Sequence, residues 1–118
     1  MIRRGSIHLV DLDPSLGSEA SKVRPAVIVS NDTANATAQR LGRGVVTVVP
    51  VTSNVRRVYP FQVYLTTSDS GLDRDSKAQA EQVRAVDVVR IGGRIGILAG
   101  RSMGELDEAI RIHLGLGL

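Results

Sequence analysis

The stretch Val45-Val46-Thr47-Val48-Val49-Pro50-Val51 (VVTVVPV) decides the fold of this 118-residue chain. It is an almost continuous run of apolar, β-branched residues, and such a run is typical of a central strand that is buried on both faces. The sequence therefore predicts a sheet that is built around residues 45–51.

Shorter β-rich runs lie on both sides of this stretch. Strands are predicted at residues 6–12, 24–30, 61–65, 77–86 and 94–98, with a long polar loop at residues 13–23. No internal repeat, linker or low-complexity tract divides the sequence, so residues 1–118 are expected to form one domain.

Two helices are predicted. Asn31 or Asp32 can cap a short helix that runs to about Arg40 and stops at Gly42. A second helix is expected to begin at Ser102, because Ser102 and Glu105 have the spacing of a capping box. Its apolar stripe would comprise Leu106, Ala109, Ile110, His113 and Leu114, and its acidic first turn Glu105, Asp107 and Glu108. The pattern is mainly β, with a terminal helix laid across a sheet.

Composition narrows the class of protein. The chain has no cysteine, which excludes disulfides and thiolate metal sites. Residues 1–5 begin basic but lack the apolar stretch of a signal peptide, and no run approaches the ~20 apolar residues of a membrane span. A soluble, cytoplasmic protein without a membrane partner is expected.

Charge is unevenly distributed. Residues 1–101 hold 14 basic and 9 acidic side chains, whereas residues 102–118 hold one basic and three acidic side chains. Arginine, which can fork onto phosphate, supplies 13 of the 15 cations. This balance permits a nucleic-acid partner, although genomic codon bias would give the same composition.

Several enzyme classes find no support in the residues. His8 and His113 are the only histidines, and both are interpreted as structural rather than as a proton-shuttling pair. Asp69, Asp73 and Asp75 surround Gly71, which favours a solvated turn over a metal site. No phosphate-binding glycine loop is present, so neither a metal nor a cofactor is expected.

Polar residues at the ends of the predicted strands remain as candidates. Arg24 opens one strand, Thr52-Ser53-Asn54 follows the buried stretch, and Ser76 and residues 81–84 lie on a later strand. Such groups can converge at the rim of a sheet, but they are also ordinary turn formers. The pattern alone leaves both interpretations open.

At these same residues the chain resembles the MazF/PemK/Kid family of toxin endoribonucleases. The matching segments cover nearly the whole chain in the same order: Arg4-Gly5, Asp11-Leu12, Gly17-Ser18-Glu19, Arg24 to Val29, Pro50 to Ser53, Tyr59-Pro60-Phe61, Glu81 to Arg84 and the C-terminal helix. The resemblance implies a strongly curved antiparallel sheet, SH3-barrel-like and of the CcdB/MazF/PemK type, with short helices and a C-terminal helix.

The resemblance also implies an activity and partners. Members cut single-stranded RNA at short sequences without metal, leaving a 2′,3′-cyclic phosphate and a 5′-hydroxyl. They usually work as homodimers with RNA in grooves at the subunit interface. A cognate MazE-like antitoxin inhibits them by threading a peptide tail through the RNA site.

By matching position, the resemblance assigns catalytic roles to Arg24 and Thr52. An ion pair of Arg24 with Glu19 or Asp32, and turn capping by Thr52, are the structural alternatives. The substrate-binding positions it implies are Ser18, Glu19, Ser53, Ser76, Glu81 and Gln82. In a regular strand Ser76 and Gln82 would share a face and Glu81 would point the other way, so either a bulge intervenes or Glu81 serves another surface. Leu16 stands near the Gly-Ser step, where the family often has an aromatic or bulky residue.

Two other functions fit the same fold. A CcdB-like toxin would bind and poison DNA gyrase without cutting RNA, and a plain RNA-binding module would bind in a salt-sensitive way without scission. The Arg24/Thr52 pair favours the nuclease.

Overall fold

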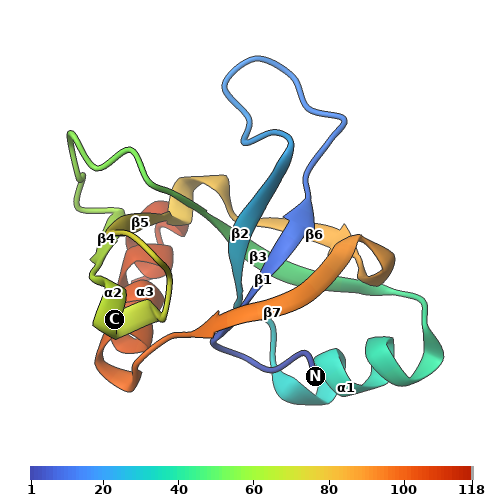
Figure 1. The fold of residues 1–118 in the computed structure, drawn as a ribbon. Coiled ribbons are helices and arrows are strands. Elements are labelled where there is room, and N and C mark those ends of the chain that lie inside the picture. The colour runs from blue at the N-terminus through green and yellow to red at the C-terminus, as the bar shows by residue number, and fades with distance from the viewer. Residues whose placement is uncertain (118) are drawn as a thin grey trace.

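The structure is a computed structural model that describes residues 1–117, so Leu118 of the predicted domain lies outside the described residues. Its core is one antiparallel sheet whose strands differ in length (Figure 1). The strands are β1 (Ser6–Asp11), β2 (Val23–Ile28), β3 (Val45–Thr52), β4 (Gln62–Leu65), β5 (Ser76–Gln79), β6 (Arg84–Asp87) and β7 (Ile91–Ile97). The fold is thus mainly β, as predicted.

Strand β3 is the centre of the sheet, which confirms the interpretation of residues 45–51. The sheet runs β4-β5-β3-β2-β1-β7, and β6 also pairs with β3. Val46 and Val48 are buried in one apolar cluster, and Val49 and Val51 in another on the opposite face. Among the described strands, β4 and β7 remain at the two ends of the path, so the sheet is not closed into a barrel.

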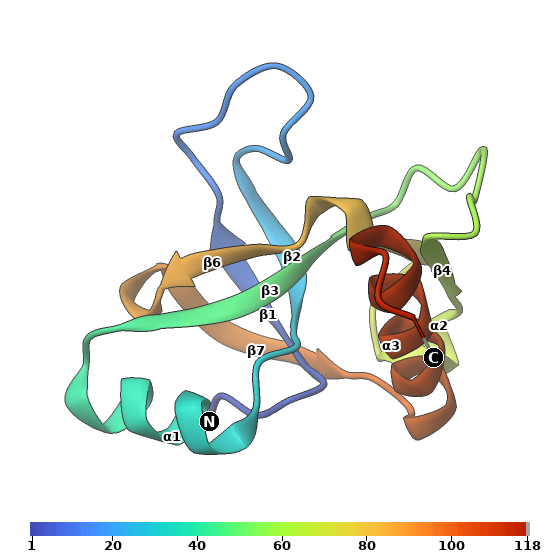
Figure 2. The ribbon, with the colours of Figure 1, turned by 180° about the vertical axis from the view of Figure 1, so that it is seen from behind.

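Helices cover the two faces. Helix α1 (Asp32–Leu41) contributes Ala38 to the first cluster, and α3 (Gly100–Leu114) contributes Leu106 and Ala109 to the second. Figures 1 and 2 show α1 and α3 at opposite ends of the sheet. None of the helices within residues 1–117 combines the length and apolarity needed to cross a membrane.

The ends of α1 confirm the sequence prediction. The Asn31 side chain accepts the Ala34 N–H at 2.9 Å, and Gly42 ends the helix with φ +67°. Helix α3 differs from the prediction. It begins at Gly100 with Ala99 as its N-cap, so Ser102 lies inside the first turn, where it is buried and its Oγ has no partner among the described residues.

Two further predictions for α3 were wrong. Glu105, Asp107 and Glu108 lie beyond its first turn, which contains no acidic residue. His113 and Leu114 do not extend the buried stripe, because both are exposed at the C-terminal end. The observed N-cap, Ala99, lies three residues before the predicted N-cap, Ser102. Neither Ala99 nor Gly100 has a capping side chain, so this start had no local signal in the sequence.

The predicted strand at residues 77–86 is broken in two. The 3₁₀ helix η1 (Ala80–Gln82) separates β5 from β6. Val51 pairs with Ala78 and Val48 pairs with Arg84, so three steps along β3 are matched by six along the other strand. The three extra residues are accommodated by η1, so the strand between Ser76 and Gln82 is irregular, as in the first of the two alternatives raised for Glu81.

The remaining elements are short. Helix α2 (Thr67–Ser70) and the 3₁₀ helix η2 (Val88–Arg90) were not predicted, and β7 begins at Ile91 instead of residue 94. Strand β7 and α2 approach closely: a Cβ on Gly96 would lie 2.3 Å from the Ser70 carbonyl oxygen. A glycine is therefore required at that contact.

Candidate active site

Two loops rise from the same side of the sheet. Residues 12–22 connect β1 to β2, and residues 53–61 connect β3 to β4 (Figures 1 and 2). The first loop is closed at its base, because the Leu12 N–H donates to the Lys22 carbonyl at 2.9 Å and the Lys22 N–H donates to Asp13 Oδ1 at 3.0 Å. The polar residues that follow β3 and precede β2 therefore lie at one edge of the sheet.

Arg24 and Thr52 come from the facing ends of β2 and β3. The pairing of these strands ends at Ala26 and Pro50. Two residues further along each strand, the same register places Arg24 opposite Thr52, and alternation puts both side chains on one face. Both residues are half-buried. The structure thus brings the two predicted catalytic residues to matched positions.

The Arg24 side chain is held at one point. Its Nε donates to the Ser21 carbonyl at 3.0 Å. Within residues 1–117 the Arg24 side chain forms no ion pair, so the alternative of a pair with Glu19 or Asp32 was wrong. Asp32 instead accepts the Arg4 N–H, which, as the largest cause, holds the pKa of that carboxyl below its usual value. The terminal nitrogens of Arg24 are left available for an anion.

Thr52 makes one local hydrogen bond. Its Oγ1 accepts the Asn54 N–H at 3.2 Å, which is the turn-capping contact expected of a threonine after a strand. Because the oxygen acts there as an acceptor, the hydroxyl proton remains free to be donated elsewhere.

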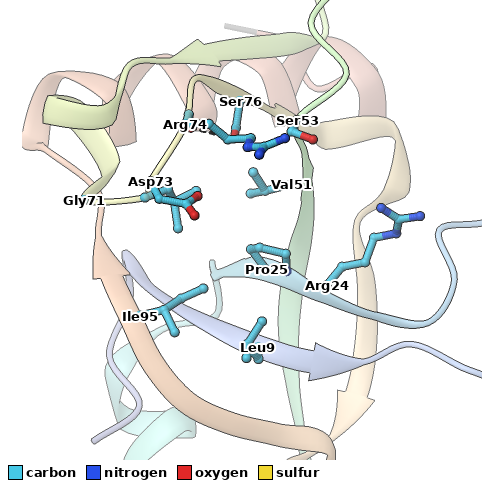
Figure 3. A pocket seen from close by; sticks show the side chains of 11 residues that line it. Leu9, Arg24, Pro25, Val51, Ser53, Gly71, Asp73, Arg74, Ser76 and Ile95 are labelled. Carbon is cyan, nitrogen blue, oxygen red and sulfur yellow. Dashed lines mark hydrogen bonds between the residues drawn. The ribbon is translucent and has the colours of Figure 1, made fainter.

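A cleft of about 540 Å³ opens beside these strand ends. Apolar side chains line its floor, and polar ones line its rim (Figure 3). The floor includes Leu9, Pro25, Val51 and Ile95, and the rim includes Arg24, Ser53, Asp73, Arg74 and Ser76. Its shape and chemistry suit a ligand with flat apolar parts and negative charges.

The cleft gathers only some of the predicted residues. Arg24, Ser53 and Ser76 line it, whereas Thr52 does not. By strand alternation Thr52 lies on the face opposite Val51, and Figure 3 shows the Arg24 guanidinium pointing away from Leu9 and Ile95. Arg24 therefore stands at the boundary between the cleft and the face that carries Thr52.

The predicted substrate residues outside the cleft lie in the first loop and in η1. Ser18 and Glu19 are exposed near the tip of residues 12–22. The side chains of Glu81 and Gln82 are already hydrogen-bonded within the protein, to Gln62 and to the backbone of the first loop.

Two cations near the site were missed by sequence reasoning. Arg74 lines the rim of the cleft, and its side chain reaches toward Ser53 (Figure 3). It lies two residues before Ser76, the spacing that puts side chains on one face of a strand, and this was the available signal. Lys77 pairs directly with Thr52 across β3 and β5, which could be known only from the register.

The histidines form no catalytic pair. His8 is buried on β1, with Nε2 at 2.8 Å from Ser6 Oγ and Nδ1 at 2.9 Å from the Gly92 carbonyl oxygen. Burial lowers the pKa of His8 despite the opposing effect of the Gly92 contact. His113 is exposed at the end of α3. Both positions agree with a structural interpretation.

Two of the three aspartates near Gly71 make local contacts, and the third, Asp73, lies on the rim of the cleft. Asp75 accepts from the Tyr64 hydroxyl at 2.6 Å and from the Thr67 N–H at 3.2 Å, and the Asp69 N–H donates to Thr66 Oγ1. Across residues 1–117, no cluster of three or more histidine, cysteine, aspartate or glutamate side chains could hold a metal ion.

Known proteins are similar to this chain in sequence or in structure. The endoribonuclease MazF9 of Mycobacterium tuberculosis is 59% identical to the chain over 116 residues, which is 98% of each protein. The M. tuberculosis toxin MazF-mt6 superposes with a TM-score of 0.76 at 26% identity, covering 96% of this chain and 99% of the other.

A third protein supports the fold alone. An endoribonuclease in complex with its cognate antitoxin, from a mycobacterial species, superposes with a TM-score of 0.76 at 24% identity, covering 98% of this chain and 97% of that one.

Residues 3–114 match the family described as the PemK-like, MazF-like toxin of type II toxin-antitoxin systems. Since that match spans nearly the whole sequence, with the polar strand ends of the site inside it, the chain belongs to the PemK/MazF toxin family.

Proposed function

We propose that this protein is an endoribonuclease that cuts single-stranded RNA at short specific sequences, as the toxin of a toxin–antitoxin pair. Its 59% identical relative is named an endoribonuclease, and the family match supports the toxin role. The observation on this chain that carries the proposal is the opposed placement of Arg24 and Thr52 on one face of β2 and β3.

The proposed reaction needs no metal ion. The 2′-oxygen of a ribose attacks the adjacent phosphorus, and the bond from phosphorus to the 5′-oxygen breaks. The 2′-hydroxyl gives up its proton and the leaving oxygen gains one, so the products are a 2′,3′-cyclic phosphate and a 5′-hydroxyl end.

Arg24 and Thr52 supply what the transition state of this reaction requires. Negative charge accumulates on the oxygens of a five-coordinate phosphorus, and donors placed there in advance stabilise it. Arg24 offers a planar pair of N–H groups, and Thr52 offers its free hydroxyl proton. A guanidinium stays protonated in proteins, so Arg24 acts by stabilising charge or by relaying a proton to the leaving oxygen, and not as a free base.

The cleft is assigned to the RNA strand beside the scissile phosphate. Nucleobases can lie against the apolar floor, and Arg74 and Ser53 on the rim can bind phosphate and ribose oxygens. The Ser76 side chain is buried and its hydroxyl donates to the Arg74 carbonyl at 3.1 Å, so its contribution is to hold the rim beside Arg74. In the loop above, the Glu19 carboxylate is suited to accept from a base amino group and Ser18 to either kind of partner. These contacts would select the cut sequence.

The assembly and its setting follow from the same family. We propose a homodimer whose seam runs along β1 and β7, where Ile97 is exposed, so that the cleft floor at Leu9 and Ile95 stays open to RNA beside the seam. A cognate MazE-like antitoxin would occupy the RNA site with a peptide tail, and the protein would work in the cytoplasm as one domain. The curvature of an SH3-like barrel is the finer fold description that this family assignment suggests.

The test is cleavage of a long single-stranded RNA by pure protein in the presence of EDTA. Discrete bands are expected, with 5′-hydroxyl and cyclic-phosphate ends, and Arg24→Ala should lower the cleavage rate by roughly 10²–10³. Arg43→Ala is the matched control, because Arg43 is exposed just before β3 begins, at the end of that strand away from Thr52.

Two results would reject the proposal. Undiminished cleavage by Arg24→Ala would remove the assigned mechanism. Intact RNA, together with DNA gyrase trapped on DNA by the same protein, would instead support a CcdB-like binding toxin.

A further inference from the structure

The 3₁₀ helix η1 lies between the bases of the two loops that border the site (Figures 1 and 2). It is the point where the strand opposite β3 gains three residues. At such a break consecutive side chains no longer alternate strictly between two faces. Glu81 and Gln82 can therefore reach in different directions, one toward each loop.

Gln82 binds the backbone of the loop at residues 12–22. Its Nε2 donates to the Ser18 carbonyl at 2.9 Å, and its Oε1 accepts the Ala20 N–H, also at 2.9 Å. One side-chain amide thus satisfies a backbone acceptor and a backbone donor that flank Glu19. This fixes the backbone on both sides of the residue that is assigned to base reading.

Glu81 holds the other loop through an intermediary. Its Oε2 accepts from Gln62 Nε2 at 2.7 Å, and Gln62 Oε1 accepts the Tyr59 N–H at 3.1 Å. Gln62 is buried. The Tyr59 ring stacks on Phe61 with centroids 5.3 Å apart, so this chain of bonds fixes the aromatic end of the loop at residues 53–61.

We infer that Glu81 and Gln82 are positioning residues that hold both substrate loops from one turn, and that they are not the RNA contacts their sequence positions suggested. An amide whose donor and acceptor are both engaged must break two hydrogen bonds before it can read a base, and leaving their partners unpaired carries a desolvation cost. The consequence for RNA rests on the proposed function, whereas the anchoring of the loops does not.

The first experiment measures amide hydrogen exchange in the free protein by NMR, without RNA. Gln82→Met removes both contacts at similar volume and should speed exchange at Ala20 by about five- to tenfold, the size expected for one lost hydrogen bond, with Tyr59 unchanged. Gln62→Met should speed exchange at Tyr59 by a similar factor and leave exchange at Ala20 unchanged. Each variant is therefore the control for the other.

A third variant separates an acceptor from a donor. Gln82→Glu keeps an oxygen for the Ala20 N–H but loses the donor to the Ser18 carbonyl, so protection at Ala20 should be retained. Unchanged exchange at Ala20 in Gln82→Met, or at Tyr59 in Gln62→Met, would overturn the inference. Thermal unfolding of each variant checks that the sheet is intact.

The second experiment measures RNA cleavage. Loosened loops should raise KM by several-fold in Gln82→Met and Gln62→Met, with kcat within about twofold and the cut sequence unchanged, because the reacting groups stay in place. A Gln82→Met protein that cuts at a different sequence while exchange at Ala20 stays slow would show that Gln82 reads RNA directly, and would overturn the inference. Absence of cleavage in every protein, wild type included, would contradict the proposed function and leave the exchange result standing.

Discussion

Arg24 and Thr52 occupy opposed register positions on adjacent antiparallel strands, two residues beyond the last paired residues Ala26 and Pro50. The strands have parted at this point, so the two backbones no longer bond to each other there. Side chains at opposed positions of a diverging pair still share a face, and the space between them can admit a ligand. A phosphate in that space would meet a guanidinium on one side and a hydroxyl on the other.

This geometry predicts that Arg24→Lys restores only part of the activity that Arg24→Ala loses. A lysine keeps the positive charge but presents a point charge in place of two parallel N–H groups. We expect cleavage about tenfold slower than wild type and at least about tenfold faster than Arg24→Ala, measured as single-turnover rates on one RNA. Equal rates for the lysine and alanine variants would contradict a role for charge.

Arg74 is predicted to contribute to RNA binding instead of to chemistry. Removing one phosphate contact should weaken affinity for any sequence and lower the slope of log K against log salt by about 0.7, the value for single strands. The measurement is fluorescence anisotropy on an RNA with a 2′-deoxy residue at the cut site, which blocks cleavage. Arg43→Ala should keep the wild-type slope, and an unchanged slope in Arg74→Ala would contradict the assignment.

The sequence predicted the strands well where the pattern was local. Residues 45–51 are apolar on both faces because β3 lies between two helix-covered clusters, and that composition is visible without coordinates. Asn31 and Gly42 likewise mark the ends of α1 through their own side chain and backbone. Each of these signals is contained within a few residues.

Features that depend on distant partners could not be predicted. The break at η1 exists because β5 and β6 pair with β3 in registers that differ by three residues. The sequence of one strand does not determine its register with another strand. The same holds for Lys77 beside Thr52. Glu81 and Gln82 were predicted to bind substrate, and only the structure shows that Glu81 bonds to Gln62 and Gln82 to the backbone of residues 18 and 20.

Ser102 offers a direct comparison between the predicted and the observed start of α3. An N-cap serine would cost about 1 kcal/mol when replaced by alanine. Ser102 instead lies inside the first turn, buried, with its hydroxyl unpartnered among the described residues. We therefore expect Ser102→Ala to leave the free energy of unfolding unchanged or to raise it by up to about 1 kcal/mol.

Asn31→Ala is the matched control for that change. Asn31 is an observed N-cap, so its replacement should lower the free energy of unfolding by about 1 kcal/mol. Urea titration of both variants and of the wild type measures the two changes. A loss of that size in Ser102→Ala would mean that Ser102 is the N-cap and that the helix begins three residues later than it does here.

His8 is predicted to make stability depend on pH below its ordinary pKa of 6.5. Burial lowers its pKa in the folded protein below the ordinary value of 6.5, with smaller contributions from the amino terminus and Arg94. In the window between the two pKa values the unfolded chain binds more protons than the folded one. Stability is therefore complete above 6.5 and is lost as the pH falls toward the folded pKa of His8.

The hydrogen bonds around His8 decide how large this loss can be. In the neutral form of His8, Nδ1 donates to the Gly92 carbonyl and Nε2 accepts from the Ser6 hydroxyl. In the protonated form, Nε2 donates to Ser6 Oγ instead. The Ser6 hydroxyl then donates its own proton to the Arg3 carbonyl, which lies 2.7 Å away. Both arrangements leave every group paired. Ser6→Ala removes the partner that the protonated form needs, so it should lower the pKa of His8 further and steepen the loss of stability in acid.

Urea unfolding at pH 7.5, 6.5 and 5.5 tests this chain of reasoning. His8→Gln should flatten the fall in unfolding free energy relative to wild type, while Ser6→Ala should deepen it. His113→Gln, which changes an exposed histidine, should follow the wild-type curve. If His8→Gln and wild type lose the same free energy over this range, the acid sensitivity arises elsewhere, and the buried imidazole is stabilised equally in both protonation states.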